Sequence, residues 1–206
     1  MATLAELKTR IISELDRDDM GSGGALETVL ANTIARAIEF HADELFWFNR
    51  KSGSANTVAS TATVALPTGM RIAQVVSYNQ VPLTKVALSD IEHLTATGVP
   101  SQWAENEGLI QLSPVPSGVY ALAVYGVADL GVPASTNEWT TEAQDLIAAT
   151  TRKILYRDTL RDIDGYNLSR MAEEEALTKL RRETRRRGRV GLVADLPDPS
   201  AIGVVT

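Results

Sequence analysis

Histidine and cysteine supply most nucleophiles, general bases and transition-metal ligands, and this chain has few of them. It contains two histidines, His41 and His93, and no cysteine. The absence of cysteine excludes disulfides, thiolate nucleophiles and cysteine-ligated zinc, and the histidines lack a metal-ligand spacing. Phosphate-binding glycine loops, the nucleophile elbow and the dinucleotide fingerprint are also missing. The sequence therefore singles out no catalytic residue, cofactor or metal, and we interpret both histidines as packing or surface residues.

Residues 16–27, DRDDMGSGGALE, come closest to a metal-binding pattern. Four of them stand where an EF-hand calcium loop has two oxygen ligands, a turn glycine and a closing glutamate: Asp16, Asp18, Gly21 and Glu27. The match fails at Met20, which offers calcium no oxygen, and at Gly23, which stands where the loop has an apolar residue. There is also no second loop to pair with it. We therefore predict a solvated acidic hinge between two helices.

Residues 179–189, KLRRETRRRGR, concentrate positive charge. They hold seven basic residues and one acidic residue, a net charge of +6, whereas the other 195 residues carry −12 and the whole chain −6. Three interpretations stay open. The segment is a solvated end of a helix, or it binds nucleic-acid phosphates, although it lacks the interleaved aromatic residues of single-strand binders. Alternatively, it binds an acidic protein surface, where each arginine can donate two hydrogen bonds to a carboxylate.

The last seventeen residues, 190–206, change in character again. They contain two aspartates and two prolines, no basic residue, and apolar positions without a helical period. They cannot bury enough surface to fold alone, yet they are more apolar than a solvating tail needs to be. We predict that they are disordered or form an extended arm that docks on a partner together with the basic helix.

Four helices are predicted to flank a β-rich middle. Thr3 and Glu6 have the spacing of a capping box, and the helix that they open should end near residues 16–19. A second helix is expected from Ala25 to Phe48. A third begins where Thr141 and Gln144 repeat the capping-box spacing. The fourth follows a break or kink at Gly165 and carries the arginines at its end, as the helix dipole favours.

Residues 51–137 are rich in small and β-branched residues interrupted by glycine and proline, which is typical of strands and turns. Strand patterns lie in RIAQVVSYNQVPL (71–83), LIQLSP (109–114) and VYALAVYGVA (119–128). The first of these turns at Asn79–Gln80. Ser89 and Glu92 have capping-box spacing, so one short helix is predicted over residues 90–97.

The composition is that of a globular protein: 206 residues, 44 % hydrophobic and 22 % charged. No run approaches the roughly eighteen apolar residues of a membrane span, and the first ten residues lack the pattern of a secretory signal. We predict an α+β fold with a mainly helical core of about four helices, a β-rich antiparallel insertion and an extended C-terminal docking arm. The boundaries are 1–50 and 138–189 for the core, 51–137 for the insertion and 190–206 for the arm.

The order of these segments resembles a known family. ALPTGMRIAQVVSYNQVPLTKVALSDIEHL, GVPSQWAENEGLIQLSPVPSGVYALAVYGVADL and NEWTTEAQDLI are similar to tailed-phage head-completion adaptors, the connectors between head and tail. The resemblance covers about residues 1–190. It implies a structural, non-enzymatic virion protein without cofactors, assembled in the host cytoplasm and placed at the head–tail junction.

Adaptors of this kind form a ring, typically a dodecamer, beneath the portal. The ring extends the DNA channel and provides a platform for the tail. The implied partners are the portal protein, tail or nozzle proteins, further copies of the chain, and genomic DNA that passes without sequence specificity; no membrane is implied. The Gly/Ser-rich residues 52–62 would face tail components, and the arm would reach the portal from its root at Lys179–Arg189. The residues expected to bind the portal are Arg185, Arg186, Arg187, Arg189, Leu192, Val193, Leu196, Ile202, Val204 and Val205.

Two other functions stay open. A peptidoglycan-degrading virion enzyme would need two carboxylates about 5–10 Å apart, and the sequence singles out no such pair. A DNA-binding module would use the basic helix at 179–189 and would bind duplex DNA with a steep dependence on salt.

Overall fold

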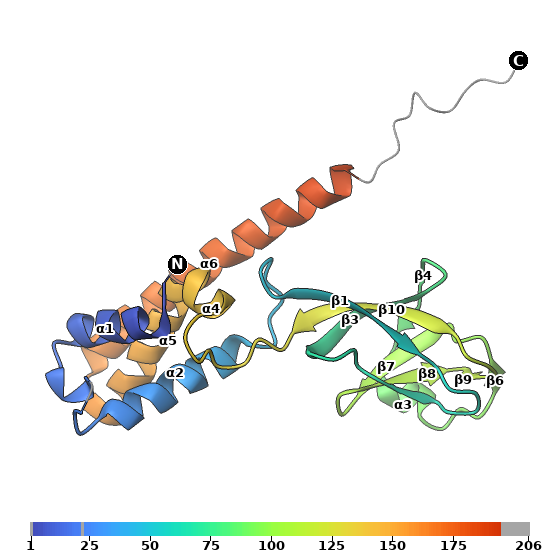
Figure 1. The fold of residues 1–206 in the computed structure, drawn as a ribbon, viewed down its shortest axis with the longest axis horizontal. Coiled ribbons are helices and arrows are strands. Elements are labelled where there is room, and N and C mark those ends of the chain that lie inside the picture. The colour runs from blue at the N-terminus through green and yellow to red at the C-terminus, as the bar shows by residue number, and fades with distance from the viewer. Residues whose placement is uncertain (1, 22, 195–206) are drawn as a thin grey trace, which may run out of the picture.

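The chain forms a helical region and a β region that lie end to end, with one long helix running away from the helical region (Figure 1). The structure is a computed structural model that describes residues 2–21 and 23–194. The helical region contains α1 (Leu4–Leu15), a 3₁₀ turn (Asp18–Met20), α2 (Glu27–His41), α4 (Glu138–Thr141), α5 (Gln144–Leu155), a π-helical turn (Tyr156–Leu160) and α6 (Ile163–Ala194). The predicted α+β class is confirmed.

The β region is built from short strands in two main sheets. Its elements are β1 (Arg50–Asn56), β2 (Thr63–Ala65), β3 (Met70–Tyr78), β4 (Val81–Pro82), β5 (Thr84–Lys85), α3 (Leu88–Ile91), β6 (Thr97–Gly98), β7 (Gln102–Asn106), β8 (Leu109–Ser113), β9 (Val115–Pro116) and β10 (Ala121–Ala128). One sheet has the order β1-β10-β3-β4 and the other β2-β8-β7-β5. The predicted turn at Asn79–Gln80 is confirmed, because both residues have positive φ, as a tight hairpin requires.

The N-terminal helix begins and ends as predicted. The Thr3 hydroxyl accepts a hydrogen bond from the Glu6 amide at 3.1 Å, and the Thr3 amide donates to the Glu6 carboxylate at 2.7 Å. This is the reciprocal capping box that the sequence indicated. The helix ends at Asp16, which adopts the left-handed conformation with φ 52°.

The prediction that the second helix extends to Phe48 was wrong, because α2 ends at His41. Residues 42–49 instead form a connector to β1. The Asn49 side chain is fully buried and holds this turn: it accepts from the Phe46 amide at 2.7 Å and donates to the Glu44 carbonyl at 2.8 Å. Phe46 and Phe48 stack with ring centroids 5.4 Å apart, and both meet the Trp139 ring edge-on. Burial of these rings overrides the helical pattern of the sequence.

Two other capping predictions were wrong by a few residues. The short helix α3 spans Leu88–Ile91 rather than 90–97, and Ser89 lies inside it and does not cap it. Near residue 140 the capping box is Asn137–Thr140, which opens α4, so that α5 begins at Gln144 without a side-chain cap. Asn137 is also fixed by donating to the carbonyls of residues 130 and 131 at 3.3 and 3.2 Å, and this tertiary role selects it over Thr141.

The break before the last helix lies at Arg161, with φ 54°, and not at Gly165. Asp162 caps the new helix by accepting from the amides of Asp164 and Gly165 at 3.0 and 3.1 Å. Gly165 lies inside the first turn, where a Cβ atom would come within 2.5 Å of the Tyr156 ring. The glycine therefore permits close packing of α6 on the preceding turn.

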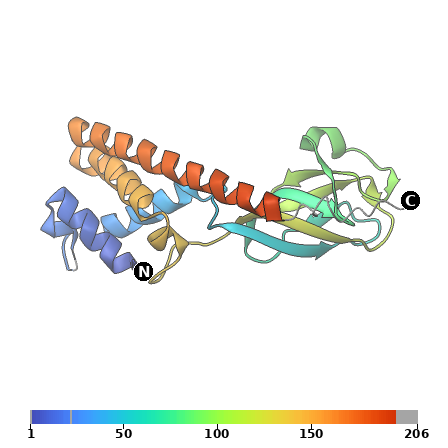
Figure 2. The same ribbon diagram turned by 90° about the horizontal axis from the view of Figure 1, so that it is seen from above.

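Helix α6 is 32 residues long and continues to Ala194. It therefore includes the first five residues of the arm that the sequence placed at 190–206. The remainder of that arm, residues 195–206, lies outside the described residues. Seen from above in Figure 2, α6 runs along the helical region and reaches the near end of the β region.

Candidate functional site

The first half of α6 is anchored on the helical region by a buried ionic network. Glu173 is 6 % exposed, and its carboxylate accepts from the Thr150 hydroxyl at 2.9 Å and from the Lys153 ammonium at 2.6 Å. His41 Nε2 lies 3.0 Å from the Thr150 hydroxyl and 3.5 Å from the carboxylate. Burial raises the pKa of Glu173, but the hydrogen bonds from His41, Lys153 and Thr150 and the charge of Lys153 outweigh it and lower the pKa to about 2.

This lowered pKa predicts a pH dependence of stability. The Glu173 pKa falls from an ordinary 4.5 to about 2 on folding, so the stabilisation is fully present above pH 4.5 and is lost as the pH falls toward 2. Urea unfolding at pH 6, 4 and 3 should show wild type losing stability faster than Glu173→Gln, so that the two converge at acid pH. Parallel pH profiles for the two proteins would contradict the assignment.

The C-terminal half of α6 contacts the connector between the two regions. The Arg181 guanidinium donates two hydrogen bonds to the Glu44 carboxylate, at 2.5 and 3.0 Å. The Trp47 amide donates to the Thr184 hydroxyl at 3.2 Å, and the Arg187 guanidinium lies 3.5 Å from the centre of the Trp47 ring. One face of the basic segment is therefore occupied inside the molecule.

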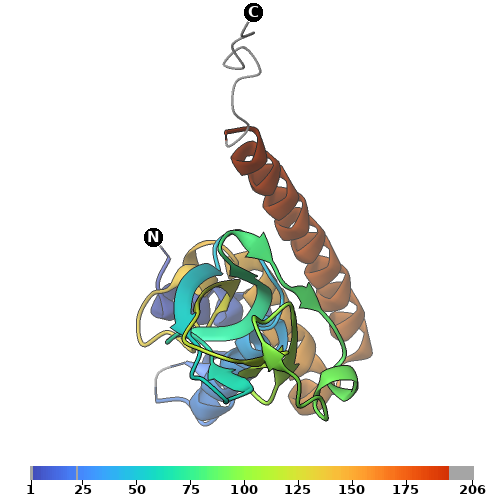
Figure 3. The same cartoon turned by 90° about the vertical axis from the view of Figure 1, so that its right-hand side faces the viewer.

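The opposite face of the basic segment is exposed. Arg182, Arg185 and Arg186 lie three and four residues apart, so their side chains share one side of the helix. Arg186 pairs with Glu183 at 2.8 Å. Among the side chains that the structure describes, neither Arg182 nor Arg185 makes an ion pair. Figure 3 shows this end of α6 projecting beyond both regions, where a partner has access to it.

The structure separates the predicted portal-binding residues into four groups. Arg185 and Arg186 face solvent, whereas Arg187 stacks on Trp47. The backbone of α6 includes Arg189, Leu192 and Val193, whose side chains lie outside the described structure. The other four, Leu196, Ile202, Val204 and Val205, lie outside the described residues altogether. Sequence reasoning missed Arg182, although its three-residue spacing to Arg185 was a signal for a shared face.

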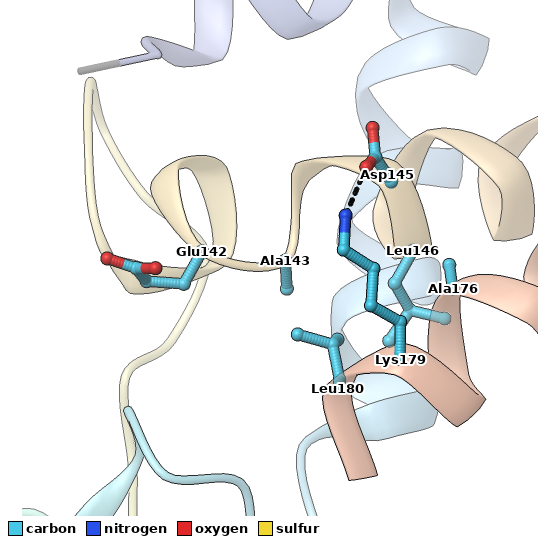
Figure 4. Close-up of a pocket in the computed structure, with 7 residues that line it drawn as sticks. All are labelled: Glu142, Ala143, Asp145, Leu146, Ala176, Lys179 and Leu180. Atoms are coloured by element: carbon cyan, nitrogen blue, oxygen red, sulfur yellow. Dashed lines mark ion pairs between the residues drawn. The ribbon is translucent and has the colours of Figure 1, made fainter. Parts of the chain in front are cut away.

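Lys179, at the start of the basic segment, faces a charged groove between α1, α5 and α6. Figure 4 shows its ammonium directed at Asp145, at 3.8 Å, above a small hollow closed by Leu146, Ala176 and Leu180. Next to it a hollow of about 310 Å³ is lined by charges of both signs. Arg10 bridges Glu14 and Asp145, each at 2.8 Å. The Arg10–Asp145 pair joins α1 to α5, and Lys179 joins α6 to the same aspartate.

The acidic side chains within residues 16–27 do not point toward a common site. Arg17 forks onto the Asp19 carboxylate at 2.9 and 2.7 Å, and Glu27 accepts from the Gly23 amide at 2.9 Å. Met20 is buried in the core. In residues 2–21 and 23–194 no three histidine or acidic side chains gather closely enough to hold a metal ion. His93, unlike the buried His41, is exposed beside Glu92.

The β region carries few charges. Between residues 50 and 128 there are four basic and four acidic residues, and the stretches 52–70 and 108–128 have none. The outer face of sheet β1-β10-β3-β4 is uncharged except at its end near α6, where Arg50 of β1 lies on the same side as Ser52 and Ser54. Strand pairing aligns two rows across it: Ser52, Tyr125 and Val75, then Ser54, Ala123, Ser77 and Pro82. The small side chains of the second row leave a hollow of about 290 Å³.

Two surface features thus stand out among the described residues: the exposed arginines at the end of α6 and the uncharged rows of the sheet face. The family model described as SU10 adaptor protein matches residues 2–194. The chain therefore belongs to this family of phage adaptors of the head–tail connector type, which makes it a structural component of a phage virion. A search of the curated proteins found no match. Among the described residues, no helix combines the length and apolar character needed to cross a membrane.

Proposed function

We propose that the chain forms a ring, typically a dodecamer, beneath the portal at the head–tail junction. The observation that carries this proposal is the exposed arginine row on the end of α6, in a chain that belongs to an adaptor family. Arginine pairs with carboxylates in a fork, so this end of α6, followed by the arm to residue 206, docks on an acidic surface of the portal. Assembly takes place in the host cytoplasm.

The β region is the platform for tail or nozzle proteins. The two residue rows aligned across its outer sheet face hold no charged side chain, so a protein surface can cover these rows without the cost of burying a charge. Figure 1 shows this sheet at the end of the molecule away from α1 and α5. The Gly/Ser-rich residues 52–62 border the same face, because β1 supplies Ser52 and Ser54 to its rows.

Genomic DNA passes through the ring without sequence-specific contacts. Outside residues 179–189 the chain carries a net charge of −12. An acidic channel lining repels phosphates and lets DNA slide. The proposal is tested by mixing the chain with purified portal and measuring sedimentation: a complex holding a ring of copies supports it, and separate sedimentation of the two proteins contradicts it.

Placing a charge in the uncharged rows of this face should block tail attachment. Ala123 lies in the middle of the second row and lines its hollow. In Ala123→Arg a guanidinium fills this hollow and must be desolvated by any partner. We expect normal portal binding but at least tenfold fewer tailed particles, counted by electron microscopy after complementation of an adaptor-deficient phage. The control is His93→Arg, which adds the same charge at an exposed position outside this face. Equal counts for the two variants would contradict the platform assignment.

A further inference from the structure

The helical and β regions have separate hydrophobic cores. One cluster is formed by α1, α2, α5 and α6 together with Phe46 and Trp139, and the other lies between the two main sheets around Val76, Trp103 and Val124. Two connectors, residues 42–49 and 129–137, join the regions. The angle between the regions is therefore set by the contacts around these connectors.

Charged contacts dominate this junction. On one side, Arg71 at the start of β3 donates to Glu39 in the last turn of α2 and to Asp43 in the first connector, at 2.5 Å each. On the other side, α6 holds the first connector through the hydrogen bond from the Trp47 amide to Thr184 and through two arginine contacts, Arg181 on Glu44 and Arg187 on Trp47. We call these two arginine contacts the α6 clamp. Buried Phe46 and Asn49 anchor the first connector in the helical region, and the charged contacts around it are groups that an ionic partner can compete for.

Both arginines of the α6 clamp remain accessible. Their side chains are 51 % and 49 % exposed, and solvent-exposed ion pairs contribute little individually. The outward arginines occupy the same two turns of helix. Arg181 lies four residues before Arg185, so carboxylates that gather around Arg185 can also reach Arg181. In the clamped state Arg181 and Arg187 contact the connector, and in the released state they do not. A partner can shift the equilibrium between these two states only as far as its affinities for them differ.

We propose that an acidic protein segment docking on α6 draws Arg181 and Arg187 away from Glu44 and Trp47 and so releases the first connector, changing the angle of the β region. This rests on the proposed function, with the acidic segment supplied by the portal. Docking on α6 is thereby coupled to the orientation of the tail platform. The coupling is reciprocal: a β region held at the released angle binds the acidic segment more tightly.

The test measures the distance between the two regions. The chain has no cysteine, so Ala5→Cys in α1 and Val119→Cys in the β region, both exposed, accept spin labels for double electron–electron resonance in the full-length chain. An oligoglutamate peptide and purified portal are the probes, and an uncharged peptide of equal length is the control. We expect both acidic probes to shift the distance distribution, and Arg181→Gln/Arg187→Gln to produce the shift without a probe.

The matched control is Arg182→Gln/Arg185→Gln, which removes two outward arginines and leaves the clamp intact. Without a probe, this variant should show the wild-type distance distribution. The oligoglutamate concentration that produces half of the shift should be at least threefold higher than for wild type. If Arg181→Gln/Arg187→Gln retains the wild-type distribution while its circular dichroism shows a folded protein, the clamp does not set the angle. Portal binding without a shift overturns the coupling and leaves the adaptor role intact, whereas a shift with oligoglutamate but no portal binding overturns the adaptor role alone.

Discussion

Reversing the three outward arginines, in Arg182→Glu/Arg185→Glu/Arg186→Glu, is expected to weaken portal binding at least 100-fold. The substitution changes the charge of the exposed face of α6 by six units, and like charges placed across an interface cost several kcal/mol. These side chains are exposed and pack against no core residue, so the fold should survive. Binding is measured by co-sedimentation with purified portal over a concentration series at fixed salt.

A second triple variant, Lys8→Glu/Arg36→Glu/Arg170→Glu, controls for net charge. It makes the same six-unit change on the helical region, away from the end of α6. We expect it to bind the portal within a few-fold of wild type. If both variants lose binding equally, the total charge of the subunit and not the arginine row controls assembly, and the docking site assigned to α6 is wrong.

Removing the Glu173 carboxylate should strongly destabilise the helical region. Glu173→Ala leaves the Lys153 ammonium, the Thr150 hydroxyl and His41 without the acceptor that all three share. Breaking a buried ion pair by removing one partner costs about 3–5 kcal/mol. The measurement is the free energy of unfolding in urea at pH 7, followed by circular dichroism.

The neighbouring residue provides the matched control for that experiment. Glu174 lies one position along α6 with its side chain 69 % exposed, paired with Arg170 at 3.9 Å. Glu174→Ala should change the stability by no more than about 0.5 kcal/mol. Similar losses for the two variants would mean that position on the helix, and not the buried network, accounts for the effect.

Local patterns in the sequence predicted the presence of helices and turns better than the residues at which helices end. The Thr3–Glu6 capping box and the Asn79–Gln80 turn were predictable because each is specified by residues within four positions. The end of α2 was not, since Phe46 and Phe48 continue a helical pattern but are buried against Trp139, about ninety residues away. Asn137 likewise caps α4 because the connector carbonyls fix its side chain, which no local spacing reveals.

The sequence identified the segment that carries the candidate site, but not which side of the helix is exposed. Residues 179–189 were identified by their charge alone, and they do lie on the projecting helix. Which arginines point outward depends on which side of α6 contacts the connector 42–49. Arg187 was predicted to bind the portal, and the structure places it on Trp47, a residue that the sequence assigned to a helix. The division between clamp and outward arginines therefore required the tertiary structure.

Sedimentation of the chain alone, and then with the portal protein of the same phage, tests the central claim most directly. We expect the chain to join the portal in one complex with ring stoichiometry, and this complex to be lost in Arg182→Glu/Arg185→Glu/Arg186→Glu. A wild-type chain that sediments separately from the portal at all concentrations would contradict it.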